Sequence, residues 1–283
     1  MMALVIPFHP RIGSAQSLVV FTNNFDGVMP VEIQPGSATL TGVQGYAGLG
    51  PSGNQFGGSF LRCPTGTNVI LTLSNLPPHQ YLNLAMLFAA IDSLDGTGSY
   101  PSGDFFTVRL GTNVVFRESF ANATESQIQS YIAPPGAQLA RRVDLGFTGP
   151  GSFYTDSAYN FGVDPRFINL AHTGAVATLS FEIEGPGIQS LGDESWAVDN
   201  LSVSVSTEIT PPVIQAIRLT GTNVSVTWYT TSNRVYQVQS KAILSDVAWN
   251  DLSPLIIATN TSMTYVEPLG TSNKFYRVKL TLP

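Results

Sequence analysis

The feature of this 283-residue sequence that most limits its possible folds is the alternation of apolar and polar residues along its apolar segments. The alternation is clear at 69–73, 106–110, 177–183 and 201–205. Successive side chains of a β-strand point to opposite faces, so a period of two indicates strands with one buried face. Helical periodicity is nearly absent. We therefore predict an all-β fold.

Two segments that lie far apart in the sequence have the character of paired strands. They are 21–27, Phe-Thr-Asn-Asn-Phe-Asp-Gly, and 194–205, which begins Glu-Ser-Trp-Ala-Val-Asp-Asn. We expect them to be the first and last strands of one closed β-domain. The predicted organisation is a leader or N-terminal extension at 1–17, a large domain at 18–206, a proline-containing linker at 207–212 and a small domain at 213–283.

Composition and charge exclude several classes of function. The 26 glycines and 19 prolines, with only 11% charged residues, are typical of short strands joined by tight turns. Residues 1–207 hold seven arginines, no lysine and fifteen acidic residues, a net charge of −8 that repels phosphate backbones. We therefore predict no nucleic-acid partner. No apolar run reaches the length of a transmembrane helix, so no transmembrane segment is expected.

Carboxylates in glycine-containing loops suggest a calcium site. Asp92 and Asp95, followed by Gly96, come directly after the continuously apolar stretch 80–91. Calcium takes six to eight oxygen ligands, and the EF-hand spacing is absent, so several segments would have to contribute. Further candidate ligands are Asn24, Asp26, Asp199 and Asn200. The alternative is that these carboxylates form turns and accept backbone hydrogen bonds.

Long loops are the expected binding face. Residues 41–58, 91–104 and 146–169 are long and rich in glycine or aromatic residues, and such connections often carry function. A flat aromatic ring can stack on the C–H face of a sugar. The candidate ligand-binding residues are Tyr46, Tyr100, Tyr154, Tyr159 and Trp196. The alternative for each ring is packing onto the sandwich.

No catalytic constellation stands out. The Glu-x-Asp-x-x-Glu ladder of jelly-roll glycosidases is missing, as are nucleophile elbows and nucleotide-binding loops. The histidines His9, His79 and His172 are scattered along the chain without metal-ligand spacing. We therefore predict that the protein is not an enzyme. A weaker alternative is a hydrolase that uses Asp193 or Glu194.

Two resemblances add to these patterns. Residues 18–206 resemble a bacterial jelly-roll, lectin-like surface domain of the MAM or concanavalin type, on Asn24-Phe-Asp-Gly27 and Asp193-Glu-Ser-Trp-Ala-Val-Asp-Asn200. Residues 213–283 resemble a short fibronectin type III module, on Val224-Ser-Val-Thr-Trp228 and Phe275-Tyr-Arg-Val278. The resemblances imply a jelly-roll β-sandwich followed by a small immunoglobulin-like or fibronectin-like β-sandwich.

The sequence therefore predicts a secreted or cell-surface, non-catalytic carbohydrate-binding or adhesion protein with a calcium-stabilised jelly roll. Its partner would be a polysaccharide or glycan. The alternative is a structural subunit of an extracellular filament or surface layer, whose partners are copies of itself.

Overall fold

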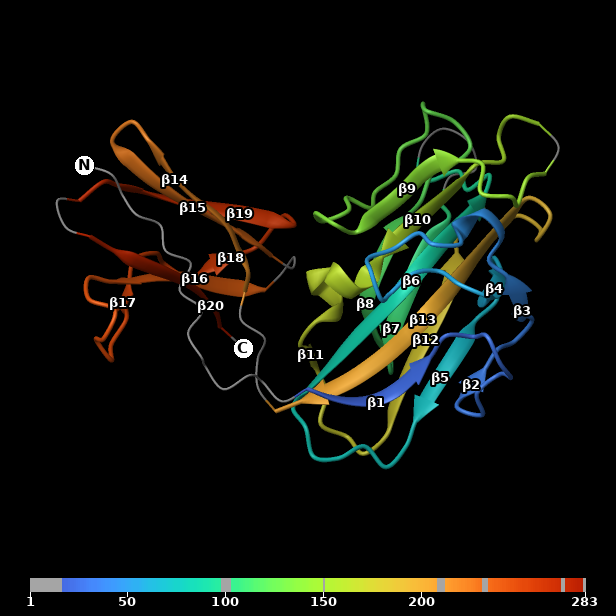
Figure 1. Ribbon diagram of the computed structural model, residues 1–283, viewed down its shortest axis with the longest axis horizontal. Coiled ribbons are helices and arrows are strands. Elements are labelled where there is room, and N and C mark those ends of the chain that lie inside the picture. The colour runs from blue at the N-terminus through green and yellow to red at the C-terminus, as the bar shows by residue number, and fades with distance from the viewer. Residues whose placement is uncertain are drawn as a thin grey trace.

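The computed structural model is built almost entirely from antiparallel β-sheets, which confirms the all-β, sandwich prediction. Strands β1 to β13 gather in one body and strands β14 to β20 in another (Figure 1). The helical segments of the described residues are single 3-10 turns: η1 (Gln44–Tyr46), η2 (Phe161–Val163) and η3 (Pro165–Phe167). The structure describes residues 17–97, 103–149, 151–207, 212–230, 234–270 and 273–281.

The larger sheet of the first body has the strand order β3-β4-β13-β6-β10-β9, with β1 also on β13 and β11 also on β6. Leu18 lies opposite Val205 and Asn23 opposite Leu201, so the first and last strands pair as predicted. The bounds are β1 (Leu18–Asn23), β3 (Thr39–Gly42), β4 (Ser59–Pro64), β6 (Tyr81–Asp92), β9 (Gln138–Val143), β10 (Asp156–Asn160), β11 (Leu170–Ala171) and β13 (Glu194–Ser206).

A second sheet packs against one face of the first. Its order is β2-β5-β12-β7-β8, formed by β2 (Ile33–Gln34), β5 (Val69–Leu73), β12 (Ala177–Glu184), β7 (Phe105–Leu110) and β8 (Asn113–Ser119). Phe106 joins the two sheets, because its ring centroid lies 4.3 Å from that of Phe88 on β6 and 5.2 Å from that of Trp196 on β13. The alternating segments of the sequence thus form the inner faces of a sandwich.

The outer face of the larger sheet is also covered. Tyr46, Phe56, Phe60 and Phe147 are buried there together with the outward-facing residues of β6. Coverage on both faces explains why the stretch 80–91 is continuously apolar. The loop at 41–58 and Phe147 from the loop at 146–169, expected to form an exposed binding face, instead supply part of a second core layer.

The second body holds two smaller antiparallel sheets. One contains β14 (Ile214–Thr220), β15 (Asn223–Tyr229) and β19 (Ser262–Pro268), and the other contains β16 (Val235–Lys241), β17 (Asn250–Asp251), β18 (Ile256–Ile257) and β20 (Phe275–Thr281). Trp228 and Tyr236 meet in its core with ring centroids 6.2 Å apart. Residues 1–16 and 208–211 lie outside the described part, so the leader and linker stay predictions.

No helix within the described residues is long and apolar enough to cross a membrane.

Candidate metal centre

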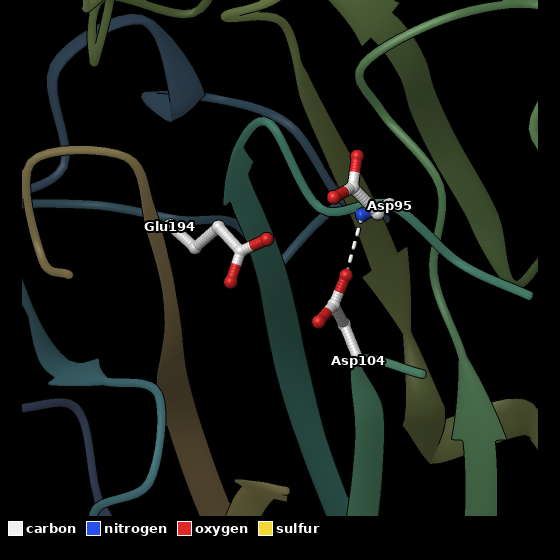
Figure 2. A group of neighbouring side chains, drawn as sticks. All are labelled: Asp95, Asp104 and Glu194. Atoms are coloured by element: carbon white, nitrogen blue, oxygen red, sulfur yellow. Dashed lines mark hydrogen bonds between the residues drawn. The ribbon is translucent and has the colours of Figure 1, made fainter. Parts of the chain in front are cut away.

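Three carboxylates from separate segments meet at one end of the first sandwich. Asp95 lies in the loop after β6, Asp104 directly precedes β7, and Glu194 is the first residue of β13. One oxygen of each lies within 4.8 Å of one oxygen of each of the others. Figure 2 shows the three side chains converging from these segments. They meet because β6 ends where β13 begins, with Glu194 opposite Asp92 in the register.

The cluster is deeply buried. Asp104 and Glu194 are 0% exposed, and Asp95 is 8% exposed. Oδ2 of Asp104 accepts the backbone N–H of Asp95 at 2.5 Å, the bond drawn in Figure 2, whereas its Oδ1 has no hydrogen-bond partner. A buried carboxylate oxygen without a partner is costly in a native protein. When all three carboxylates are ionised, the site therefore leaves a strong acceptor without a donor.

A glycine fixes the path of the loop that carries Asp95. Gly96 has φ of +69°, and a Cβ there would lie 2.4 Å from the carbonyl oxygen of Ile128. A side chain at this position would therefore push apart the loop at 94–97 and the segment at 128. Gly96 thus lets the Asp95 loop pack directly against the segments at 121 and 128, with which Asp95 and Thr97 form β-bridges.

Two amides complete the surroundings of the cluster. Nε2 of Gln127 donates to Asp95 Oδ1 at 2.5 Å, and Nε2 of Gln189 lies 3.4 Å from both Asp95 Oδ2 and Glu194 Oε1. The backbone N–H of Gln189 also donates to Glu194 Oε2 at 2.9 Å. Within the part of the chain that the structure describes, no Arg or Lys forms an ion pair with these carboxylates. Their negative charge is not balanced by a basic side chain.

Burial changes the acidity of all three groups. Burial, followed by the negative charge of Asp104, raises the pKa of Glu194 to about 9. Burial raises the pKa of Asp104 to about 6, and the charge of Asp95 adds to this rise against the opposing backbone N–H bonds. The pKa of Asp95 is also raised, chiefly by burial. Without a cation, the site therefore retains a proton near neutral pH.

The geometry suits a hard cation. Calcium–oxygen distances of about 2.3–2.6 Å place two oxygens on opposite sides of the ion about 4.6–5.2 Å apart, so the carboxylates can reach one ion together. Both glutamine amides would offer Oε1 to the ion after a half-turn of the amide group. Asp95, Asp104 and Glu194 are the group that metal-ligand spacing picks out among the acidic, histidine and cysteine side chains of the described residues.

The predicted ligands Asp95 and Asp92 separate in the structure. Asp92 has φ of +62°, which turns the chain at the end of β6. Its carboxylate lies 3.7 Å from Nη2 of Arg62, and its backbone N–H donates to Asp156 at 3.1 Å. Burial and then the charge of Asp156 raise the pKa of Asp92 to about 7. Asp92 is therefore paired with an arginine and is not part of the cluster.

The other four predicted ligands lie near one another, but their contacts are those of turn residues. Asp26 and Asp199 accept backbone N–H groups of residues 57–59, at 2.7 and 3.2 Å. Asp199 also accepts the N–H of Asn200 at 2.7 Å, and the Asn24 amide donates to Asp26 at 2.8 Å. These bonds occupy both oxygens of each carboxylate, which supports the alternative of backbone hydrogen bonding.

Most of the aromatic residues that were predicted to contact a ligand are buried in the structure, so that prediction was wrong for them. The rings that are 0% exposed, and so present no face to a ligand, are those of Tyr46, Tyr159 and Trp196. The Tyr46 hydroxyl donates to the backbone oxygen of Ala90 at 3.1 Å, which is a structural role. Tyr154 is partly exposed and hydrogen-bonds to Asp193. Tyr100 lies outside the described residues.

Sequence reasoning missed two of the three clustered carboxylates as ligands, and both glutamines. Asp104 and Glu194 each stand immediately at the start of a strand with alternating residues. Their position at strand ends was a usable signal, because the ends of paired antiparallel strands meet at a sheet edge. No local motif marks Gln127 or Gln189.

Comparisons with known proteins give little direct help. No family model matches the chain, and no curated protein matches it. Among solved structures, the chain is similar to a beta-1,2-glucanase from Parabacteroides distasonis, with 9% sequence identity and a TM-score of 0.27. The match covers 93% of this chain but 36% of the glucanase chain, so this chain spans about a third of that protein.

The glucanase is an enzyme, whereas the sequence predicted a non-catalytic binding, adhesion or structural protein, and that prediction is not retained. The exclusion of enzymatic activity is withdrawn. A TM-score of 0.27 transfers neither a substrate nor catalytic residues, so the function proposed below is argued from the side chains of this chain.

Proposed function

We propose that the first sandwich is a calcium-binding domain whose ion is held by Asp95, Asp104 and Glu194. The observation that carries the proposal is the unpartnered, fully buried Oδ1 of Asp104, which shares its surroundings with two other buried carboxylates. A cation at this position would accept all three groups as ligands. It would satisfy the orphaned oxygen and offset two of the three negative charges in one step.

The energetic argument favours an ion over empty space. Ionised carboxylates that are buried without a partner cost several kcal/mol each in a protein interior. Amide donors from Gln127 and Gln189 offset only part of that cost, because they are neutral. The competing solution is a proton shared between Asp104 and Glu194, which their raised pKa values permit. Calcium and this proton therefore compete for the same site.

The ligand chemistry selects the type of metal. The donors are carboxylate and amide oxygens, which suit calcium, magnesium and manganese, whereas zinc and copper favour nitrogen and sulfur ligands. Magnesium requires a near-ideal octahedron and keeps several waters, which a buried site supplied by five side chains does not readily accommodate. Calcium tolerates irregular coordination with six to eight oxygens, so it fits this arrangement best.

The ion would fasten together segments that are distant in the sequence. The ligands belong to the loop after β6, the start of β7 and the start of β13, while Gln127 and Gln189 come from two further loops. The bound ion thus orders one whole end of the sandwich. A secreted or cell-surface location is part of the proposal, because calcium sites of extracellular modules are matched to the high calcium concentration outside cells.

Metal analysis tests the proposal directly. The full chain is stripped with chelator and dialysed against calcium, and the bound metal is then measured by mass spectrometry. We expect about one calcium per chain for the native protein and for Glu125→Gln, a control in which an exposed glutamate is neutralised. We expect no retained calcium for Asp104→Asn or Glu194→Gln. Equal retention by all four proteins, or by none, would refute the site.

A further inference from the structure

Two histidines that are far apart in the sequence form a hydrogen-bonded pair at the opposite end of β6. His79 precedes β6, and His172 follows β11, whose Ala171 lies opposite Tyr81 of β6. This pairing brings Nε2 of His79 to 2.8 Å from Nδ1 of His172, with the two ring planes 18° apart. The sequence spacing gave no hint of the pair, because sheet pairing creates it.

The outer nitrogens of the pair are both held by backbone carbonyls. Nδ1 of His79 lies 2.6 Å from the oxygen of Pro77, and Nε2 of His172 lies 3.2 Å from the oxygen of Val176. A carbonyl oxygen only accepts hydrogen bonds, so each outer nitrogen must carry the hydrogen. A neutral imidazole has one N–H, so in two neutral rings both inner nitrogens would be bare. Two lone pairs would then face each other at 2.8 Å.

We infer that the pair holds one additional proton between Nε2 of His79 and Nδ1 of His172, as a single imidazolium–imidazole unit. The extra proton turns a lone-pair repulsion into a charge-assisted hydrogen bond, and all four ring nitrogens then have a proper partner. A metal ion does not fit between the rings. Two nitrogens on one tetrahedral zinc, at about 2.0 Å each, lie about 3.3 Å apart.

The surroundings make this proton specific to the pair. The neighbouring segments, residues 74–84, 170–177 and 204–206, contain no Asp, Glu, Lys or Arg, and Tyr81 is their one other titratable side chain. A charged group does come near them, because Nη2 of Arg234 donates to the backbone oxygen of Asn169 at 3.0 Å. Burial and then the charge of His79 lower the pKa of His172, so the unit resists a second extra proton. The pair is thus expected to keep a charge of +1 over a range of pH.

The hydrogen bond between the two histidines links the turn before β6 to the turn after β11. Gln80, next to His79, donates its N–H to Ser206 at the end of β13, and the N–H of His172 donates to the oxygen of Gln80. The extra proton shared by the pair should be lost only above pH 6.5, the pKa of a free histidine. A further extra proton should bind only below that value. The pair therefore stabilises the fold most between the two steps. That contribution is lost as the pH rises through the upper step, or falls through the lower one.

A nuclear magnetic resonance titration of the imidazole nitrogens tests the inference. The full chain is labelled with nitrogen-15 in a His9→Gln background, so that only the two paired histidines report. We expect two titration steps separated by more than one pH unit, one on each side of about 6.5. Replacing His172 by Gln removes the second imidazole, so a single titration step should remain in place of two. The variant with His172→Gln is used only if its spectrum remains dispersed, which shows that it is folded. The titration of the His9→Gln protein tests the inference without it.

Two outcomes would overturn the inference. One is a pair of coincident steps near pH 6.5 in the His9→Gln protein. The other is two neutral rings at pH 6.5 in which one outer nitrogen has lost its hydrogen, because a changed tautomer then replaces the extra proton.

Discussion

Replacing Glu194 by Gln should have opposite effects on stability with and without calcium. The pKa of Glu194 is raised from 4.5 to about 9, so the folded state binds its proton more tightly than the unfolded state does. Stability of the metal-free protein therefore falls as the pH rises from 4.5 towards 9. Between 4.5 and pH 7 that loss reaches about 3 kcal/mol, at 1.36 kcal/mol for each pH unit.

In chelator at pH 7, Glu194→Gln should therefore melt at a higher temperature than the native protein. Glutamine keeps an oxygen for the N–H of Gln189, which donates to Glu194 at 2.9 Å, so little else is lost. A gain of up to about 3 kcal/mol corresponds to a Tm about 6–12 °C higher in a domain of this size. In calcium at a hundred times its Kd, the native protein should gain about 2.7 kcal/mol and the variant almost nothing.

Differential scanning calorimetry of the full chain, in chelator and in calcium, measures both effects. The first-domain transition of native protein should move up by about 5–10 °C on adding calcium. That of Glu194→Gln should stay where it is, while Glu125→Gln should follow the native protein in both conditions. A variant that melts below the native protein in chelator, with neither responding to calcium, would refute the reasoning. Glu194 would then be an ordinary hydrogen-bonded side chain.

Four further predictions concern the first sandwich. Calcium affinity should rise about tenfold per pH unit between pH 6 and 9, because the ion displaces the Glu194 proton, and calorimetric titrations at several pH values measure it. Phe88→Ala should lower the free energy of unfolding by about 3–5 kcal/mol in urea, since Phe88 is fully buried; a loss below 1 kcal/mol would contradict the described core. Gly58→Ala should also lower the free energy of unfolding in urea, because Gly58 has φ of +52° and the added Cβ would overlap the Asp26 carboxylate. Arg62→Met leaves Asp92 buried without its cation and should raise the pKa of that carboxyl, already raised to about 7 by burial and Asp156, still further, which carbon-13 carboxyl titration detects.

Much of the fold follows from local pattern. The alternating segments at 69–73, 106–110 and 177–183 correspond closely to β5, β7 and β12. The pairing of β1 with β13 follows from two matched strand sequences. Residues 41–58 were misjudged, because glycine-rich composition indicates a loop but not what the loop covers. Tyr46 and its neighbours bury themselves on the outer face of β6, which the continuous apolarity of that strand already implied.

The site depended on contacts that no local pattern records. Asp92 and Asp95 are three residues apart, yet the left-handed backbone at Asp92 directs them to different surroundings. Asp104 and Glu194 join Asp95 only because β6, β7 and β13 have ends at the same edge of the sandwich. The ligand set of such a site is determined by strand order and register, which the sequence does not state.

A crystal structure of the calcium-loaded protein tests the central claim most directly. We expect an ion between Asp95, Asp104 and Glu194, with carboxylate oxygens at about 2.3–2.6 Å and at least one amide oxygen turned towards it. The contradicting result is the same site without an ion in the presence of calcium, and with Asp104 and Glu194 oxygens about 2.5–2.7 Å apart. That separation would show that a shared proton alone satisfies the buried carboxylates.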